Sequence, residues 1–229
     1  MPTKKFQIYL VDGHAIIEEN ENIILIDTGS PSTIHSQHTL NFMGSAYPVS
    51  QNYGSVTIPV LCDLVGTRIT TLIGMDILRK YSIIFDYPNK HITFSNDNNI
   101  EFQAENLPLR IMHGVPVINA TINQSTIPCF FDSGAKLSYL KAVETHNLNR
   151  LIETEDFYPG VGRFNTATFE IETRVGNRTF PVIYGNLPRN VENQLLTLVD
   201  GNNGILGYDF LSKFKIYLNA SLNDLRITD

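Results

Sequence analysis

Two short motifs each combine a carboxylate, a small hydroxyl residue and a glycine at the end of an apolar run. The first is Asp27-Thr28-Gly29-Ser30, and the second is Asp132-Ser133-Gly134-Ala135, which begins 105 residues later. Two carboxylates held within hydrogen-bonding distance cannot both ionise cheaply, so one pKa rises and the pair shares a proton. Such a pair can act on a water as general base and on a carbonyl as general acid. The motifs therefore predict acid–base chemistry wherever the fold brings the two aspartates together.

Matching sequence around both motifs indicates an internal repeat. Each motif follows an extended stretch and a polar turn, which predict a hairpin that leads into a buried strand. Downstream, Leu72-Ile73-Gly74 and Ile205-Leu206-Gly207 each begin a short helical pattern that is followed by another hairpin. The second triplet follows the first by 133 residues, so the second repeat holds 28 extra residues between its two motifs.

The paired motifs resemble the aspartic proteases of the pepsin and retropepsin type, and the resemblance spans nearly the whole chain. In that family, two lobes or two identical subunits each donate one such loop across a pseudo-twofold axis. The resemblance implies that Asp27 and Asp132 are the catalytic pair, with no metal and no cofactor. It also implies a supporting role for the loop residues and for the two downstream glycines: Thr28, Gly29, Ser30, Ser133, Gly134, Ala135, Gly74 and Gly207.

The fold class that the resemblance implies is all-β, a bilobal pepsin-like (acid protease) fold with two retropepsin-like lobes. We expect the lobes to cover residues 1–103 and 104–229, joined near the polar stretch 96–99. Strand-like patterns with turn signals fill much of the remainder, including 55–61, 168–174 and 179–184. Helical patterns are confined to brief pieces at 140–151 and 191–196. The extra residues of the second repeat are expected in a hairpin at Asn177 and in the stretch 186–203.

The loop residues differ at the third position after each aspartate. The hydroxyl of Ser30 can donate a hydrogen bond to Asp27 and favour its ionised form, whereas Ala135 has no such donor for Asp132. Retroviral subunits have alanine at this position. We therefore predict an activity optimum less acidic than that of gastric pepsin, at about pH 4–6.

Substrate capture in the family uses a hairpin flap that covers the cleft. In the second repeat, the glycine-rich stretch Tyr158-Pro159-Gly160-Val161-Gly162 begins 26 residues after Asp132 and is the best candidate. In the first repeat, Tyr53-Gly54-Ser55 lies at the same distance from Asp27, and Tyr47-Pro48 is a competing match. Either stretch also fits an ordinary hairpin turn.

Composition narrows the classes of function. The 229 residues are 42% hydrophobic and 17% charged, with a formal net charge of −6, and they can bury a sizeable core. Neither half has the basic stripe that nucleic-acid binding requires, and no apolar run approaches a membrane span. Cys62 and Cys129 lie in apolar runs as expected for buried thiols. No signal peptide is seen, so we expect a cytoplasmic protein, with export by another route left open.

Two functions remain. One is an aspartic endopeptidase that hydrolyses peptide bonds in extended polypeptides, and the alternative is a catalytically silent peptide-binding module of the same fold. A lone aspartate after a strand is usually a turn residue, but chance turns do not recur with matched downstream segments. The presence of both aspartates and both loop glycines favours the enzyme. Because both motifs lie on one chain, we expect a monomer whose partner is a peptide or protein substrate.

Overall fold

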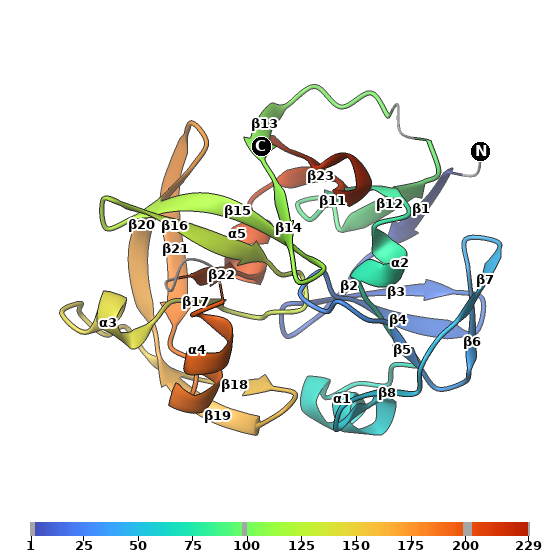
Figure 1. Ribbon diagram of the computed structural model, residues 1–229, viewed down its shortest axis with the longest axis horizontal. Helices are drawn as coiled ribbons and strands as arrows, with labels where there is room; N and C mark the ends of the chain where they lie inside the picture. The colour runs from blue at the N-terminus through green and yellow to red at the C-terminus, as the bar shows by residue number, and fades with distance from the viewer. Residues whose placement is uncertain (1–2, 98–99, 199–202, 229) are drawn as a thin grey trace.

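The internal repeat is visible in the way two sheets are built. The computed structural model describes residues 3–97, 100–198 and 203–228 (Figure 1). In the first half, β4 (Asn22–Ile26) runs parallel to β10 (Thr71–Ile73), and in the second half β16 (Ser125–Phe131) runs parallel to β22 (Gly204–Leu206). Ile26 lies opposite Ile73, and Phe131 lies opposite Leu206, so the two pairings share one register.

Strands dominate the described residues, which confirms the predicted all-β class. The first-half sheet has the order β2 (Tyr9–Val11), β3 (His14–Glu19), β4, β10 and β5 (Ile34–His35). The second-half sheet has the order β14 (Arg110–Met112), β15 (Val115–Ile122), β16, β22, β17 (Ser138–Tyr139), β21 (Arg178–Gly185) and β20 (Phe169–Val175). Three separate hairpins are β6 (Thr39–Phe42) with β7 (Ser45–Pro48), β8 (Asn52–Tyr53) with β9 (Val56–Thr57), and β18 (Glu153–Tyr158) with β19 (Gly162–Ala167).

A six-stranded sheet joins the two halves. Its order is β1 (Thr3–Gln7), β12 (His91–Ser95), β11 (Ser82–Asp86), β23 (Lys215–Asn219), β24 (Asp224–Thr228) and β13 (Glu105–Pro108). Each half contributes three neighbouring strands, and the antiparallel pairing of β11 with β23 is the seam between them. The chain crosses from one half to the other near 96–99, where residues 98–99 lie outside the described part.

Helices are short and sit at the ends of strands. They are α1 (Ile58–Val65), α2 (Met75–Leu78), α3 (Ala142–Thr145), α4 (Arg189–Leu195), α5 (Tyr208–Leu211) and the 3₁₀ turn η1 (Ala220–Leu222). α2 and α5 each begin after the glycine of an apolar-apolar-glycine triplet, as the repeat predicts. The helical patterns at 140–151 and 191–196 correspond to the shorter α3 and to α4.

The predicted strand at 55–61 is wrong, because only Val56 and Thr57 are extended and α1 follows at once. Thr57 caps the helix by accepting a hydrogen bond from the Val60 N–H, and Pro59 lies in the first turn. Gly66 ends the helix in the left-handed conformation, with φ of 77°. These capping signals outweigh an apolar pattern that fits strand and helix equally well.

The extra residues of the second repeat lie mainly where the sequence places them. Strands β20 and β21 form a hairpin that turns at Gly176 and Asn177, and α4 follows. Residues 199–202 of the predicted 186–203 stretch lie outside the described part of the chain. The first half has α1 between its two motifs in place of that hairpin.

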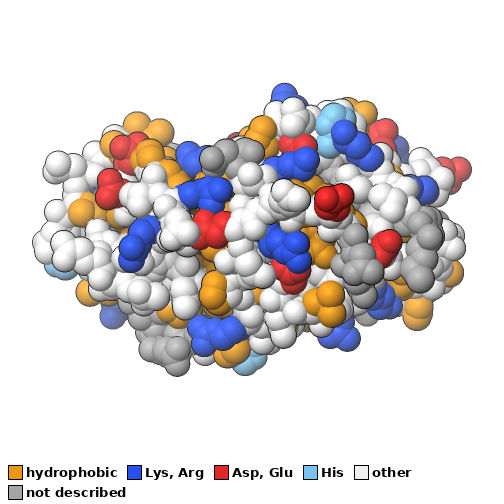
Figure 2. All heavy atoms as spheres, turned by 90° about the horizontal axis from the view of Figure 1, so that it is seen from above, with side chains coloured by type: hydrophobic (Ala, Val, Ile, Leu, Met, Phe, Trp, Pro, Cys, Tyr) orange, Lys and Arg blue, Asp and Glu red, His pale blue; other side chains and the backbone are white. Residues whose placement is uncertain are grey.

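Apolar side chains from both halves form one continuous core under the six-stranded sheet. The rings of Phe85 and Phe131, one from each half, have centroids 6.2 Å apart at this core. On the face of the molecule seen from above, basic and acidic side chains are interspersed (Figure 2).

Candidate active site

Asp27 and Asp132 lie together at the junction of the two halves. Each follows the last residue of a central strand, and its N–H donates to the strand that pairs in parallel. The Asp27 N–H lies 3.1 Å from the carbonyl oxygen of Ile73, and the Asp132 N–H lies 3.0 Å from that of Leu206. The two carboxyls are in hydrogen-bond contact with each other. The fold therefore brings together the two carboxylates that the motifs single out.

Behind the carboxyls, Thr28 and Ser133 tie the two loops together. The Thr28 N–H donates to the Ser133 Oγ at 3.0 Å, and the Ser133 N–H donates to the Thr28 Oγ1 at 2.9 Å. Each hydroxyl in turn donates across the interface, from Thr28 to the Phe131 carbonyl at 2.7 Å and from Ser133 to the Ile26 carbonyl at 2.9 Å. The hydroxyl residues thus link the loops as the resemblance implies.

The glycines allow this close approach. A Cβ on Gly29 would overlap the carboxyl of Asp132, and a Cβ on Gly134 would overlap that of Asp27. Gly74 and Gly207 lie behind the loops, where their N–H groups donate to Thr33 Oγ1 and Ser138 Oγ at 2.9 and 3.1 Å. Glycine at the two loop positions is therefore a steric requirement for the aspartate pair.

The expected role of the Ser30 hydroxyl is wrong. It donates to the carbonyl of Ser32 at 2.8 Å, and it is the backbone N–H of Ser30 that donates to Asp27 Oδ1 at 2.9 Å. In the second loop, the N–H of Gly134 donates to Asp132 Oδ1 at 2.8 Å. Each carboxylate thus accepts a hydrogen bond from a backbone N–H of its own loop, and the Ser30 and Ala135 side chains do not distinguish the two aspartates.

Burial is the main electrostatic influence on the pair. It raises the pKa of both carboxyls, and the charge of Asp132 raises the pKa of Asp27 further. Backbone hydrogen bonds oppose this rise but do not reverse it. Two coupled carboxyls lose their protons as a unit, so a state with one shared proton exists over a range of pH.

The aspartates open into a cleft of about 500 Å³ between the halves. Gly29, Ser30, Gly134 and Ala135 line it beside the dyad, whereas Thr28 and Ser133 are buried behind it. Its walls are mainly apolar on both sides. The apolar lining includes Leu25, Ile34, Leu61 and Leu72 from the first half and Val115, Phe130, Leu187 and Ile205 from the second.

Two hairpins, one from each half, complete the lining. Tyr158 and Gly160 come from the turn of β18–β19, and Tyr53 comes from the shorter β8–β9. Tyr158 lines the same cleft as the dyad, and burial, followed by the charges of Asp132 and Asp27, raises its pKa. Val161 and Gly162 belong to the same turn but do not line the cleft, and Val161 points its side chain toward solvent.

The competing match at Tyr47 is wrong as a cleft residue. Tyr47 lies on β7, where its hydroxyl is 2.6 Å from that of Tyr81, away from the cleft lining. Tyr53 is therefore the first-half tyrosine that lines the cleft.

Several cleft residues carry no sequence signal of their own. His14, Lys136, Tyr139, Asp156 and Phe157 all line the cleft at its second-half hairpin. The Tyr139 hydroxyl donates to the Asp156 carboxylate, and burial raises the pKa of Asp156. Lys136 and Tyr139 follow Asp132 within seven residues but match no motif, whereas long-range folding brings His14, Asp156 and Phe157 to the cleft.

Comparison with solved structures identifies the architecture. A crystal structure of an aspartic proteinase from Irpex lacteus superposes with a TM-score of 0.57, covering 99% of this chain and 97% of that one at 12% identity. The fold is that of an aspartic proteinase. No protein-family model and no curated protein sequence matches the chain.

Two further searches of the structure concern metals and membranes. Within residues 3–97, 100–198 and 203–228, no group of three or more histidine, cysteine, aspartate or glutamate side chains is arranged to hold a metal ion. In the same part of the chain, every helix is too short or too polar to cross a bilayer.

Proposed function

We propose that this protein is an aspartic endopeptidase whose catalytic pair is Asp27 and Asp132. The observation that carries the proposal is the contact between the two carboxyls at the base of a cleft, held by the reciprocal bonds of Thr28 and Ser133. With one proton shared, the ionised carboxylate takes a proton from a water that lies between them. The protonated carboxyl donates to the oxygen of the peptide carbonyl that the water attacks.

The shape of the cleft supports an extended peptide as substrate. Apolar walls on both sides of the dyad favour apolar side chains on both sides of the bond to be cut, because burying them removes apolar surface from water. Both aspartates belong to one chain, so the proposed enzyme is complete as a monomer.

The raised pKa values support an optimum less acidic than that of pepsin. Activity requires one proton on the pair, and burial shifts the loss of that proton upward in pH. We keep the optimum of about pH 4–6 as part of the proposal.

The decisive experiment is digestion of a denatured protein mixture from pH 3 to pH 7, with fragments identified by mass spectrometry. Asp132→Asn should reduce cleavage by about 10³-fold, because general acid–base catalysis contributes roughly 10²–10⁴-fold. Glu18→Gln, an exposed carboxylate of β3, is the matched control and should cleave like the wild type.

The same digestion tests the peptide-binding alternative, which the two-residue strands of β8–β9 favour because they cover little of the cleft. If wild type and Asp132→Asn are both folded and neither produces fragments at any pH, the endopeptidase proposal fails. Retention of a peptide by that silent protein would then support the binding module.

A further inference from the structure

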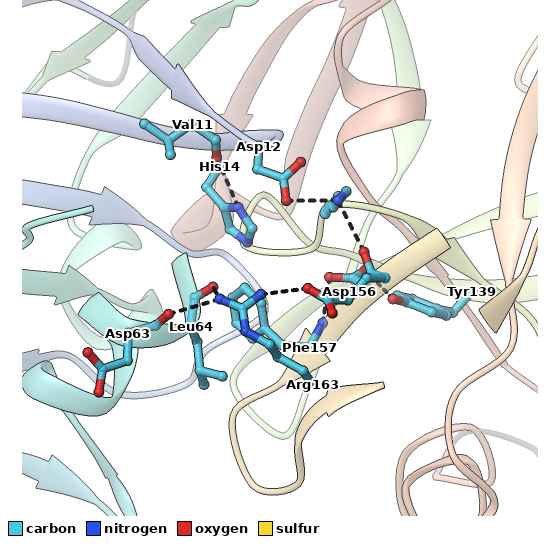
Figure 3. Close-up of polar contacts among 11 residues, drawn as sticks. Val11, Asp12, His14, Asp63, Leu64, Tyr139, Asp156, Phe157 and Arg163 are labelled. Atoms are coloured by element: carbon cyan, nitrogen blue, oxygen red, sulfur yellow. Dashed lines mark hydrogen bonds and ion pairs between the residues drawn. The ribbon is translucent and has the colours of Figure 1, made fainter. Parts of the chain in front are cut away.

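The hairpin β18–β19 belongs to the second half, yet an arginine near its turn contacts a helix of the first half. The Nη2 of Arg163 donates to the carbonyl oxygens of Asp63 and Leu64 at 2.9 and 3.0 Å (Figure 3). These carbonyls lie in the last turn of α1, where they lack partners within the helix and carry partial negative charge. A guanidinium from the other half therefore caps α1.

Phe157 makes a second contact with the first half. It lies directly opposite Arg163 in the hairpin register, so both side chains emerge on the same face. The Phe157 ring stacks on His14, with centroids 5.3 Å apart and planes inclined by 12°. It also packs against the buried first-half cluster that contains Ile16, Leu25 and Leu61. An apolar contact thus accompanies the charged one.

Other contacts fix the middle of strand β18. Lys136 donates to the Asp12 carboxylate of the first half at 2.7 Å and to the carbonyl of Glu155 at 3.2 Å. The Tyr139 hydroxyl bonds Asp156 within the second half. The hairpin is therefore attached to both halves, through Arg163 to α1 of the first half and through Asp156 to Tyr139 of the second (Figure 3).

We propose that Arg163 is a positioning residue: its contact with α1 makes the predicted flap, β18–β19, a strap that is tied to both halves and keeps Tyr158 in the cleft that holds the dyad. This inference rests on the proposed function, because it assigns the strap to the binding of the peptide substrate. A peptide that reaches the dyad lies against this strap, and Arg163 stabilises the closed arrangement without touching the reacting atoms. Loss of the Arg163 contact should weaken peptide binding more than it slows the chemical step.

The test compares four variants by two measurements. Arg163→Ala removes the contact to α1, and Arg163→Lys keeps a charge that cannot reproduce the planar donor geometry. Glu155→Gln removes the negative charge of the ion pair between Glu155 and Arg163 within the hairpin, at 3.0 Å, and leaves the α1 contacts intact. Arg174→Ala is the matched control, because Arg174 lies on β20 and contacts Thr121 of its own half at 3.4 Å.

The first measurement is amide hydrogen exchange of residues 153–167 in the free protein, which needs no activity. We expect Arg163→Ala to exchange about tenfold faster than wild type, since a hydrogen bond from a charged group is among the stronger ones. Arg163→Lys should lie between them, and Arg174→Ala should match wild type. Equal exchange in Arg163→Ala and Arg174→Ala would overturn the strap.

The second measurement is steady-state cleavage of a quenched fluorescent peptide. Arg163→Ala should raise KM by about five- to tenfold and change kcat by less than about twofold. A fall in kcat with unchanged KM, or an equal effect of Glu155→Gln, would refute the positioning role. If the wild type cleaves nothing while exchange still depends on Arg163, the proposed function fails and the strap stands.

Discussion

At the scale of single residues, the site depends on the hydroxyls of Thr28 and Ser133, which link the two aspartate loops. Ser133 is 1% exposed, and its oxygen both accepts from the Thr28 N–H and donates to the Ile26 carbonyl. Removing the Ser133 hydroxyl leaves the buried Thr28 N–H without its acceptor, which costs more stability than losing a hydrogen bond at the surface.

Ser133→Ala should therefore lower the free energy of unfolding by about 1–3 kcal/mol, the usual cost of a buried unsatisfied group. It should also reduce cleavage, because the two loops lose part of their link. Chemical denaturation and the peptide assay measure the two effects. Ser30→Ala is the control, since its hydroxyl bonds only within its own loop, and it should change stability less. An equal loss in both variants would contradict this account.

The raised pKa of Asp27 predicts a pH-dependent gain in stability for Asp27→Asn. A carboxyl whose pKa is higher in the folded protein favours folding below its ordinary value of 3.8, and that stability is lost as the pH rises through the folded pKa. Asparagine avoids the loss, so the variant should be more stable than wild type at pH 7, by about 1.4 kcal/mol for each unit of elevation. The difference should disappear below about pH 3.8. Thermal melts across this range measure it, and a variant less stable at pH 7 would refute it.

At the scale of elements, the repeated parts were the predictable ones. The strands beside each motif, the triplets at Gly74 and Gly207 and the hairpin at Gly176 follow from local patterns of alternation and turns. The helix α1 was missed because its apolar residues, Ile58, Leu61 and Val65, were interpreted without the capping residues around them.

The residues of the site also divide into those that the sequence predicts and those that it does not. The aspartates and glycines could be found from the sequence because they recur, and a repeat is visible without knowledge of the fold. The hydrogen-bond partner of the Ser30 hydroxyl could not be predicted from the sequence, because loop geometry decides whether it donates to Asp27 or to the Ser32 carbonyl. The contact of Arg163 with α1 joins residues about a hundred positions apart and has no local signature.

Gly66→Ala tests the contribution of α1. Gly66 has φ of 77°, a conformation that costs other residues roughly 1–2 kcal/mol, so the variant should lose about that much stability. Because α1 supplies Leu61 to the cleft and carbonyls to Arg163, we also expect a higher KM. Gly44→Ala is the control, with the same φ of 77° and open space around it, but in the β6–β7 turn. Both should lower the melting temperature similarly, and a KM change shared by both would contradict the role of α1.

At the scale of the molecule, a shared sheet and a polar cluster join the two halves. The seam of the six-stranded sheet includes a buried polar cluster in which Ser82 contacts the Tyr217 hydroxyl at 3.2 Å and the Asn219 amide at 3.0 Å. Ser82 comes from one half, and its two partners come from the other.

We therefore expect one cooperative unfolding transition. The calorimetric enthalpy should equal the van't Hoff enthalpy, because opening either half exposes the shared core. The decisive comparison is differential scanning calorimetry against far-ultraviolet circular dichroism on the same sample. Two resolved transitions, or a calorimetric enthalpy well above the van't Hoff value, would show that the halves are independent.

The unequal hairpins over the cleft have one more consequence. The β18–β19 strands are six residues long and the β8–β9 strands are two residues long, although the aspartate loops and the strands that hold them are closely similar in the two halves. Two identical subunits would offer a bound peptide the same contacts whether it ran forward or backward. Here the two directions are not equivalent, so a peptide substrate of the proposed enzyme would have one preferred direction along the cleft.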